Sequence, residues 1–343
     1  MGEENKKSKI WIWLLFVLLF LAIIGGIYYF FTKNQVNKTS TGESASSEIA
    51  MKNALEKWTR DDKMIMANTT STDTHKITDD LYRMYRMGQG GIYYSESTDG
   101  ISFDGGKSTG VTEDKGKMIS NPTVLKIYDG KWIMIYEQAP IRQPGEKLGS
   151  PGVSNQRNLY LATSTDGEAF IEAGVAVDSS KADNYFASVP ELVLMPSNVV
   201  VMYYVSGGES IARAYSIDEG RSWTRNNDYV LENAVDPDII VELDISAVKN
   251  NQVGGKMKFT MYYSMLDPAK NAIYKATSID GEEWNLAGKV LEKKNSNSAI
   301  VDPDVVEIST GKYMMFFGES ESETSTGGSA INLYRATTDE SIF

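Results

Sequence analysis

The sequence predicts an all-β chain, a five-bladed β-propeller preceded by one N-terminal transmembrane helix and a short linker. Three observations carry this prediction. A short turn motif recurs five times, a proline-containing segment recurs four times, and one long apolar stretch lies near the N-terminus. With 343 residues, of which 41% are hydrophobic, the chain is long enough to bury a large core.

The turn motif follows a tyrosine-bearing strand and reads Ser or Thr, any residue, Asp, and usually Gly, with an aromatic residue shortly after. It occurs at residues 97–103, 164–170, 216–223, 278–284 and 337–343. The aspartates lie 52 to 67 residues apart, which is close to the length of one four-stranded blade with its loops. Ser and Asp accept hydrogen bonds within such turns and Gly supplies a positive φ, so we interpret the motif as structural rather than catalytic.

The proline-containing segments are expected to open the inner strand of each blade. They lie at 121–125, 189–193, 236–240 and 302–306. Proline has no N–H to donate and is tolerated at the first residue of a strand. The first blade lacks this proline, and alignment through its second strand places Asp73 at the equivalent position. The strand-like segment 58–66 should pair with the last blade and close the ring, which removes two exposed sheet edges.

The N-terminus predicts a membrane anchor. Residues 10–31 form a stretch of 22 uncharged, mostly apolar residues, long enough to cross a bilayer. Lysines in the preceding segment favour an N-terminus inside the cell. The predicted organisation is a cytoplasmic tail (1–9), a single-pass signal anchor (10–31), a flexible linker (32–50) and a propeller outside the cytoplasm (51–343).

Composition excludes several kinds of site. The chain has no cysteine, which rules out disulfides, thiolate metal sites and cysteine nucleophiles. Its net charge is −12, and its 34 basic residues form no long cluster outside the terminus. Because nucleic-acid binding requires clustered Lys and Arg, no nucleic-acid partner is expected.

Differences among the blades indicate where chemistry could take place. The inner strands open with different polar residues, which should converge on one mouth of the channel: Asp73, Asn121, Glu191, Asp236 with Asp238, and Asp302 with Asp304. Carboxyl groups held close together raise one another's pKa, so one can act as an acid while another stays ionised as a base. The same ring could hold a structural calcium ion, with Asp238 and Asp304 as candidate ligands, or could hold only water. No other cofactor is expected.

Three further residues are candidates for contacting a substrate. Arg83 and Glu137 lie on or just after second strands of the first two blades, and arginine could bind a substrate carboxylate or phosphate. Tyr185, shortly before Glu191, could stack on a sugar ring. The alternative for Arg83 is an ordinary ion pair with an acidic neighbour.

The motifs Asp236-Pro237-Asp238-Ile239-Ile240 and Asp302-Pro303-Asp304-Val305-Val306 resemble blades of five-bladed propeller glycosidases of the arabinanase, levansucrase and invertase superfamily, including glycoside hydrolase family 43. The Asp turns resemble sialidase Asp boxes. The glycosidase resemblance implies an aspartate base, a second aspartate and a glutamate acid from three successive blades. It assigns Asp73 as base and Glu191 as acid, with Asn121 or Thr123 where the second aspartate is expected. Asp236 and Asp302 would tune pKa values or contact sugar hydroxyls.

Two functions follow from this resemblance and the predicted anchor. The first is a membrane-anchored, extracytoplasmic glycosidase-like propeller that cleaves a glycan. The alternative is a noncatalytic carbohydrate- or protein-binding propeller at the cell surface. An open pocket in which Glu191 faces a second carboxylate across a sugar-sized space would favour the enzyme, and a filled channel would favour binding.

Overall fold

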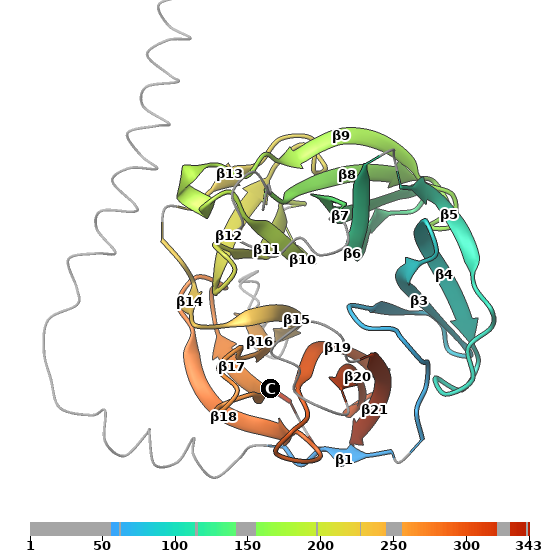
Figure 1. Ribbon diagram of the computed structural model, residues 1–343, viewed down its shortest axis with the longest axis vertical. Coiled ribbons are helices and arrows are strands. Elements are labelled where there is room, and N and C mark those ends of the chain that lie inside the picture. Colours follow the sequence, from blue (N-terminus) through green and yellow to red (C-terminus); the bar gives the residue numbers. More distant parts are fainter. Residues whose placement is uncertain are drawn as a thin grey trace, which may run out of the picture. The chain divides into compact units, whose positions relative to one another are not determined.

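The computed structural model describes residues 56–61, 63–113, 116–141, 156–196, 198–226, 228–244, 256–320, 330–340 and 342–343. Within these residues the chain forms five antiparallel sheets arranged as blades around a channel (Figure 1). Each inner strand contacts the inner strands of both neighbouring blades, so the ring is closed. The all-β, five-bladed fold predicted from the turn repeat is confirmed.

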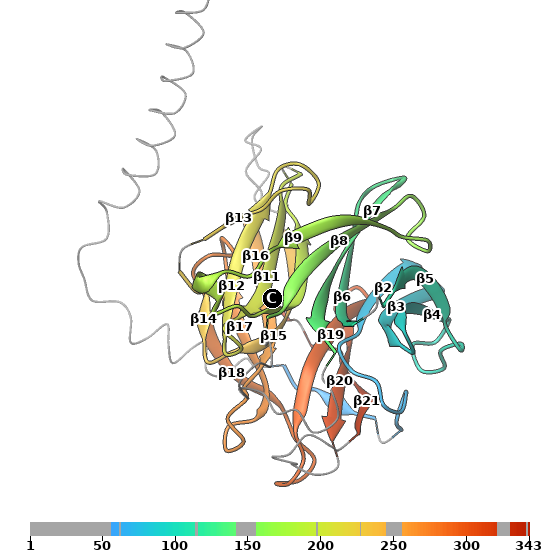
Figure 2. The ribbon, with the colours of Figure 1, turned by 45° about the horizontal axis from the view of Figure 1, so that its top comes forward.

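In the first four blades, successive strands are hydrogen-bonded in chain order outward from the channel, apart from a short fifth strand in the third blade. The inner strands are β2, β6, β10, β15 and β19, and β6, β15 and β19 can be followed near the middle of Figure 2. The first blade comprises β2 (Asp73–Thr78), β3 (Leu81–Gly88), β4 (Gly91–Ser97) and β5 (Lys107–Thr112). The second comprises β6 (Lys117–Tyr128), β7 (Lys131–Pro140), β8 (Asn158–Ser164) and β9 (Ile171–Val177). The third comprises β10 (Ala187–Leu194), β11 (Val200–Ser206), β12 (Ser210–Ser216), β13 (Thr224–Arg225) and β14 (Leu231–Glu232).

The fourth blade comprises β15 (Val235–Asp244), β16 (Lys256–Ser264), β17 (Ala272–Ser278) and β18 (Asn285–Glu292). The fifth comprises β19 (Ile300–Ser309), β20 (Lys312–Ser320), β21 (Ile331–Thr338) and, from the start of the propeller, β1 (Thr59–Arg60). One 3₁₀ turn, η1 (Lys181–Asp183), precedes β10.

The predicted ring closure is confirmed. Thr59 and Arg60 of β1 pair with Thr337 and Ala336 of β21. Further along, Met66 forms an isolated bridge with Leu333. The N-terminal segment therefore supplies the outer strand that the last blade lacks.

The position of the prolines is corrected. They do not open the inner strands, because β6, β10, β15 and β19 each begin earlier. Each proline instead lies at a shift in register, as between Ser120 and Thr123 or between Val235 and Asp238. A bulge needs no N–H at that step, which is why proline is tolerated there.

The hydrophobic core consists of five clusters, each between two neighbouring blades. Second strands supply much of it, and β11 is buried along its whole length. Methionines of these strands, including Met84, Met134, Met202 and Met261, are fully buried. Burying each such side chain contributes about 1.5–3 kcal/mol, so these residues stabilise the ring rather than bind a ligand.

The Asp turns have the hydrogen bonds expected of a structural motif. In the second blade, Gly167 N donates to Ser164 Oγ at 3.0 Å, and the N–H groups of Glu168 and Ala169 donate to Asp166 Oδ1. Gly167 has a φ of 74°. Equivalent bonds hold the turns that follow β4, β12 and β17.

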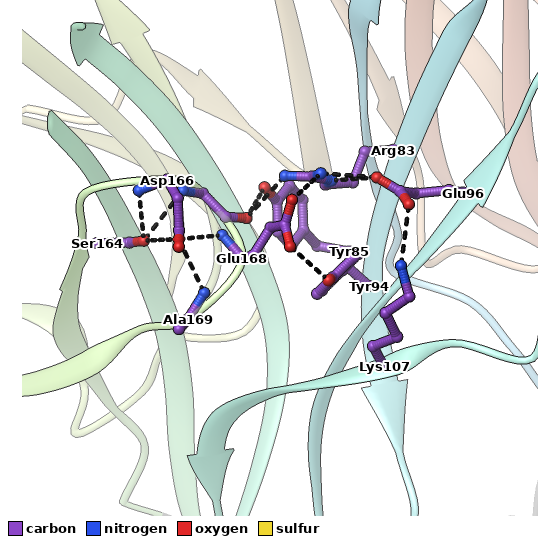
Figure 3. Close-up of polar contacts among 10 residues, drawn as sticks. Arg83, Tyr85, Tyr94, Glu96, Lys107, Ser164, Asp166, Glu168 and Ala169 are labelled. Atoms are coloured by element: carbon purple, nitrogen blue, oxygen red, sulfur yellow. Dashed lines mark hydrogen bonds and ion pairs between the residues drawn. The ribbon is translucent and has the colours of Figure 1, made fainter. Parts of the chain in front are cut away.

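Each Asp turn also contacts the preceding blade, and we call such a contact an inter-blade latch. In Figure 3, Arg83 of the first blade pairs with Glu96 of its own blade at 2.6 Å and with Glu168 of the second-blade turn at 2.7 Å. Tyr85 Oη donates to Gly167 O at 2.5 Å. The latch between the third and fourth blades repeats this pattern, with Arg213 on Glu282 and Tyr203 on Gly281.

The latch between the fourth and fifth blades uses the N-terminal segment instead. Glu56, whose side chain is fully buried, pairs with Lys275 at 2.7 Å. It also accepts hydrogen bonds from Tyr262 Oη at 2.5 Å and Trp58 Nε1 at 3.3 Å. Glu56 thus takes the place that Glu168 and Glu282 occupy in the two latches described above.

The predicted transmembrane anchor at 10–31 and linker at 32–50 lie outside the described residues. Among the residues that are described, no helix is long and apolar enough to cross a membrane.

Candidate functional site

Five residues of left-handed backbone conformation surround one end of the channel. We call them the mouth ring, and they occupy equivalent positions in successive blades: Ser71, Asn121, Val189, Asp236 and Asp302, with φ between 43° and 55°. Four of them lie at the bulge of their inner strand, whereas Ser71 lies two residues before β2 begins. The bulge turns the following residues toward the axis, which is why the site forms here.

A second set of residues lies two positions further along each inner strand. We call this the inner ring, and it consists of Asp73, Thr123, Glu191, Asp238 and Asp304. Each member pairs with the equivalent residue of its second strand, from Tyr85 for Asp73 to Phe316 for Asp304. The sequence prediction had merged the two rings into one, because the bulge that separates them is not visible as a motif.

The two rings enclose a cavity, which confirms that the inner strands bring unlike acids together. Its lining includes five carboxylates: Asp73, Glu191, Asp236, Asp238 and Asp302. It encloses about 30 Å³, room for one or two water molecules, whereas ligand pockets usually measure about 300–1,000 Å³. None of its lining residues is a lysine or arginine.

Hydrogen bonds hold two of the inner-ring acids in place. Asp304 is buried, and its carboxylate accepts bonds from the hydroxyls of Thr72 and Thr74, both at 2.7 Å, and from Thr74 N at 3.0 Å. Asp73 accepts a bond from Val124 N, and His75 Nε2 lies 3.1 Å from its Oδ2. Burial lowers the pKa of His75, but the Asp73 carboxylate outweighs this effect, so the net pKa lies above the usual value.

The remaining acids of the inner ring are poorly compensated. Loss of hydration raises the pKa of Glu191 well above its usual value, and the nearby charges of Asp238 and Asp73 raise it further. Its hydrogen bond from Thr123 Oγ1, at 3.3 Å, acts in the opposite direction. Loss of hydration likewise raises the pKa of Asp238, whose Oδ2 is buried without a hydrogen-bond partner.

The same causes act on the other acids. Burial raises the pKa of Asp304 to about 6, with a further contribution from Asp73. In the mouth ring, burial and the charge of Asp302 raise the pKa of Asp236. Asp302 N donates to Asp236 Oδ2 at 3.3 Å, and Asp302 accepts a bond from Thr70. Burial and neighbouring charges therefore raise the pKa values of several carboxyl groups at the mouth.

The predicted calcium site at Asp238 and Asp304 is not supported. Among the described residues, no group of three or more His, Asp or Glu side chains is arranged to hold a metal ion. Asp304 accepts hydrogen bonds from Thr72 and Thr74 and is not among the residues that line the cavity with Asp238.

Glu137, predicted to contact substrate, lies beneath the mouth. Its side chain is fully buried, and it accepts hydrogen bonds from Arg157, Ser188 and, at 2.8 Å, from Asn121 Nδ2. It therefore supports the mouth ring at Asn121 instead of lining the cavity.

Two other predicted contacts are not part of this cavity. Arg83 is committed to the latch between the first and second blades, the ion-pair alternative considered from the sequence. Tyr185 follows η1, is 53% exposed and does not line the cavity. The residues that line the cavity but were not predicted as site residues include Ser71 and Val189. The signal for Val189 was its position before a proline, shared with Asn121, Asp236 and Asp302.

The chain is similar to several solved structures. One is an exo-1,5-α-L-arabinanase from a bovine ruminal metagenomic library, with 12% identity over 80% of this chain and 94% of that chain and a TM-score of 0.52. Another is Zg3597, a family 117 glycoside hydrolase of the marine bacterium Zobellia galactanivorans, with 11% identity over 83% and 90% of the two chains and a TM-score of 0.59. A third is the GH43 endo-arabinanase from Bacillus licheniformis, with 13% identity over 81% and 94% and a TM-score of 0.52. No protein-family model and no curated protein matches the sequence. At these identities the similarity concerns the fold.

Proposed function

We propose that this chain, which has the propeller fold seen in family 43 and family 117 glycoside hydrolases, cleaves a glycan at the channel mouth. The observation that carries the proposal is that Glu191 and four other carboxylates line one small cavity, where the pKa of Glu191 is raised. Acids with perturbed pKa values in a concave site are typical of acid–base chemistry. The structural acids of this chain, those of the latches, are instead paired with bases.

In this proposal Glu191 is the proton donor. Its raised pKa favours the protonated carboxyl, which is the form that can donate a proton to a leaving glycosidic oxygen. Asp73 is the base that activates water, oriented by Val124 N and His75. Asp236 and Asp302, on the mouth ring above, would contact sugar hydroxyls.

A second function, glycan binding without cleavage, is favoured by the size of the cavity. About 30 Å³ does not admit a sugar ring, so a glycan would rest on the mouth ring rather than enter between the acids. The second blade also presents Thr123 at the inner ring, where the other blades present acids.

For location, we propose that residues 10–31 anchor the chain and hold the propeller outside the cytoplasm. This rests on the length of the apolar stretch and on the lysines that precede it.

The test is a hydrolysis screen of the full-length chain in detergent micelles against arabinan, xylan, fructan and aryl glycosides. Glu191→Gln should lower turnover about 10²–10⁴-fold, because the amide cannot donate the proton. Glu113→Gln is the matched control, since Glu113 is exposed and only its backbone N–H makes a bond, to Gly90 O. Unchanged turnover in Glu191→Gln would remove the assignment. Binding of a glycan without cleavage by the parent chain would support the second function instead.

A further inference from the structure

The mouth ring contains one residue that does not suit its backbone conformation. All five members adopt a left-handed φ, which ordinary side chains rarely do. Asn and Asp are the non-glycine residues that tolerate this region best, and they occupy three of the positions. The third blade has Val189 there, with a φ of 43°. A β-branched residue at positive φ is strained.

The polar members of the ring use their side chains, and Val189 cannot. Asn121 donates to Glu137, Asp302 accepts from Thr70, and Asp236 accepts from Asp302 N. A valine forms none of these bonds. Val189 therefore carries backbone strain that no local hydrogen bond offsets, whereas the same position in the second blade is an Asn-Pro step with a bonded side chain.

Val189 lines the same cavity as Glu191, two residues further along β10. It is partly exposed, so its methyl groups form one wall of the mouth. Backbone strain of this kind persists where the surrounding structure imposes it, and such residues cluster at functional sites. We propose that Val189 is a positioning and specificity-determining residue, a strained apolar wall that limits the hydration of the Glu191 carboxyl in the shared cavity and offers a ligand an apolar contact at the third blade.

Two consequences follow. Without any ligand, a polar residue at position 189 would hydrate the cavity and make Glu191 easier to ionise. With a ligand, the wall would pack against the C–H face of a sugar ring while the other four blades offer polar side chains. The second consequence rests on the proposed function, and the first does not.

The experiment compares the full-length chain with Val189→Asn, which reproduces the Asn-Pro step of the second blade. Tm is recorded from pH 4 to pH 9, for each chain with and without Glu191→Gln. The change in Tm caused by Glu191→Gln varies with pH as Glu191 ionises. The pH at the midpoint of this variation therefore reports the ionisation of Glu191 without a substrate. We expect Val189→Asn to raise Tm by about 2–4 °C and to move this midpoint to lower pH.

The matched control is Asn198→Val, which places a valine at a left-handed position (φ 59°) in the exposed turn between β10 and β11. It should lower Tm by a similar amount and leave the Glu191 midpoint unchanged. Val189→Gly, which removes the side chain without a conformational penalty, should move the midpoint in the same direction as Val189→Asn and covers the case in which asparagine does not fit.

A Tm that falls or stays constant in both Val189 variants would show that no strain is stored there and would overturn the proposal. So would a higher Tm with an unchanged Glu191 midpoint. Failure of the proposed function would give a different result. The parent chain would neither cleave nor bind any glycan, but Val189→Asn would still move the Glu191 midpoint to lower pH. Where a glycan is bound, Val189→Asn should weaken its binding about tenfold.

Discussion

Acidic side chains occupy two regions of the propeller, and their surroundings are opposite. At the inter-blade latches, each glutamate lies against a base: Glu168 against Arg83, Glu282 against Arg213 and Glu56 against Lys275. At the mouth, five carboxylates line one cavity, and no lysine or arginine lines it with them. The latch acids contribute to stability through their partners, whereas the mouth acids oppose it.

This contrast separates structure from function within one repeat. A latch is rebuilt at successive blade junctions, and the N-terminal segment contributes to it where the last turn, residues 337–343, has no glycine. The mouth differs from blade to blade and keeps unfavourable charges near one another. A group that costs stability and differs among repeats is a functional candidate on physical grounds.

The largest expected effect is at the latch between the fourth and fifth blades. Lys275→Ala leaves the buried Glu56 without its cation, so we expect a loss of about 3–5 kcal/mol in the free energy of unfolding, measured by urea denaturation. The double variant Lys275→Met with Glu56→Gln removes both charges and keeps an acceptor for Tyr262. It should recover most of the loss. A single variant as stable as the parent would show that this latch does not hold the ring closed.

A smaller effect of opposite sign is expected at the mouth. The pKa of Asp304 is raised from 3.8 to about 6, so its contribution to stability is full below pH 3.8 and is lost as pH rises through about 6. Asp304→Asn cannot ionise, and its amide can still bond Thr72 and Thr74. We expect it to stabilise the chain by roughly 1–3 kcal/mol at pH 8 and to have little effect at pH 4.

Thermal or urea unfolding of Asp304→Asn at both pH values measures this difference. An asparagine variant that is less stable than the parent at pH 8 would mean that the ionised Asp304 is compensated after all. The mouth would then resemble the latches.

The smallest effect is expected at an Asp turn. Hydrogen bonds from the Ser222 hydroxyl and Ser222 N lower the pKa of Asp218 to about 2. A lowered pKa contributes stability above pH 3.8 that is lost as pH falls through about 2. Because Asp218 is partly exposed, solvent screens this contribution, and Asp218→Asn should cost less than about 1 kcal/mol at pH 7. A larger loss, measured by urea denaturation, would place the turns among the main stabilising features.

The fold was predictable because its signals are local. The Ser-x-Asp-Gly turn and the apolar second strand recur within each blade, so counting turns gave the number of blades. The unpaired segment 58–66 predicted that the ring closes by pairing with the last blade. The site was predictable only in part, because its two rings arise from a bulge. The sequence shows that Asn121, Val189, Asp236 and Asp302 precede proline but not that they share a left-handed conformation.

Arg83 and Glu137 illustrate the same limit. Both are charged residues near strand ends, which is a site-like pattern in sequence. Arg83 instead pairs with Glu168 of the next blade, and Glu137 is buried beneath Asn121. These partners are distant along the chain, so only the packing of blades reveals them.

The central claim is that the mouth holds unlike acids, from blades distant along the chain, around one small cavity where their pKa values are raised. The most direct test is the free energy of unfolding of the full-length chain from pH 4.5 to pH 8. Because the pKa values of Glu191, Asp236, Asp238 and Asp304 are raised, native protein binds more protons than unfolded protein in this range, and stability should fall as pH rises. A stability that is constant or rises toward pH 8 would contradict the account.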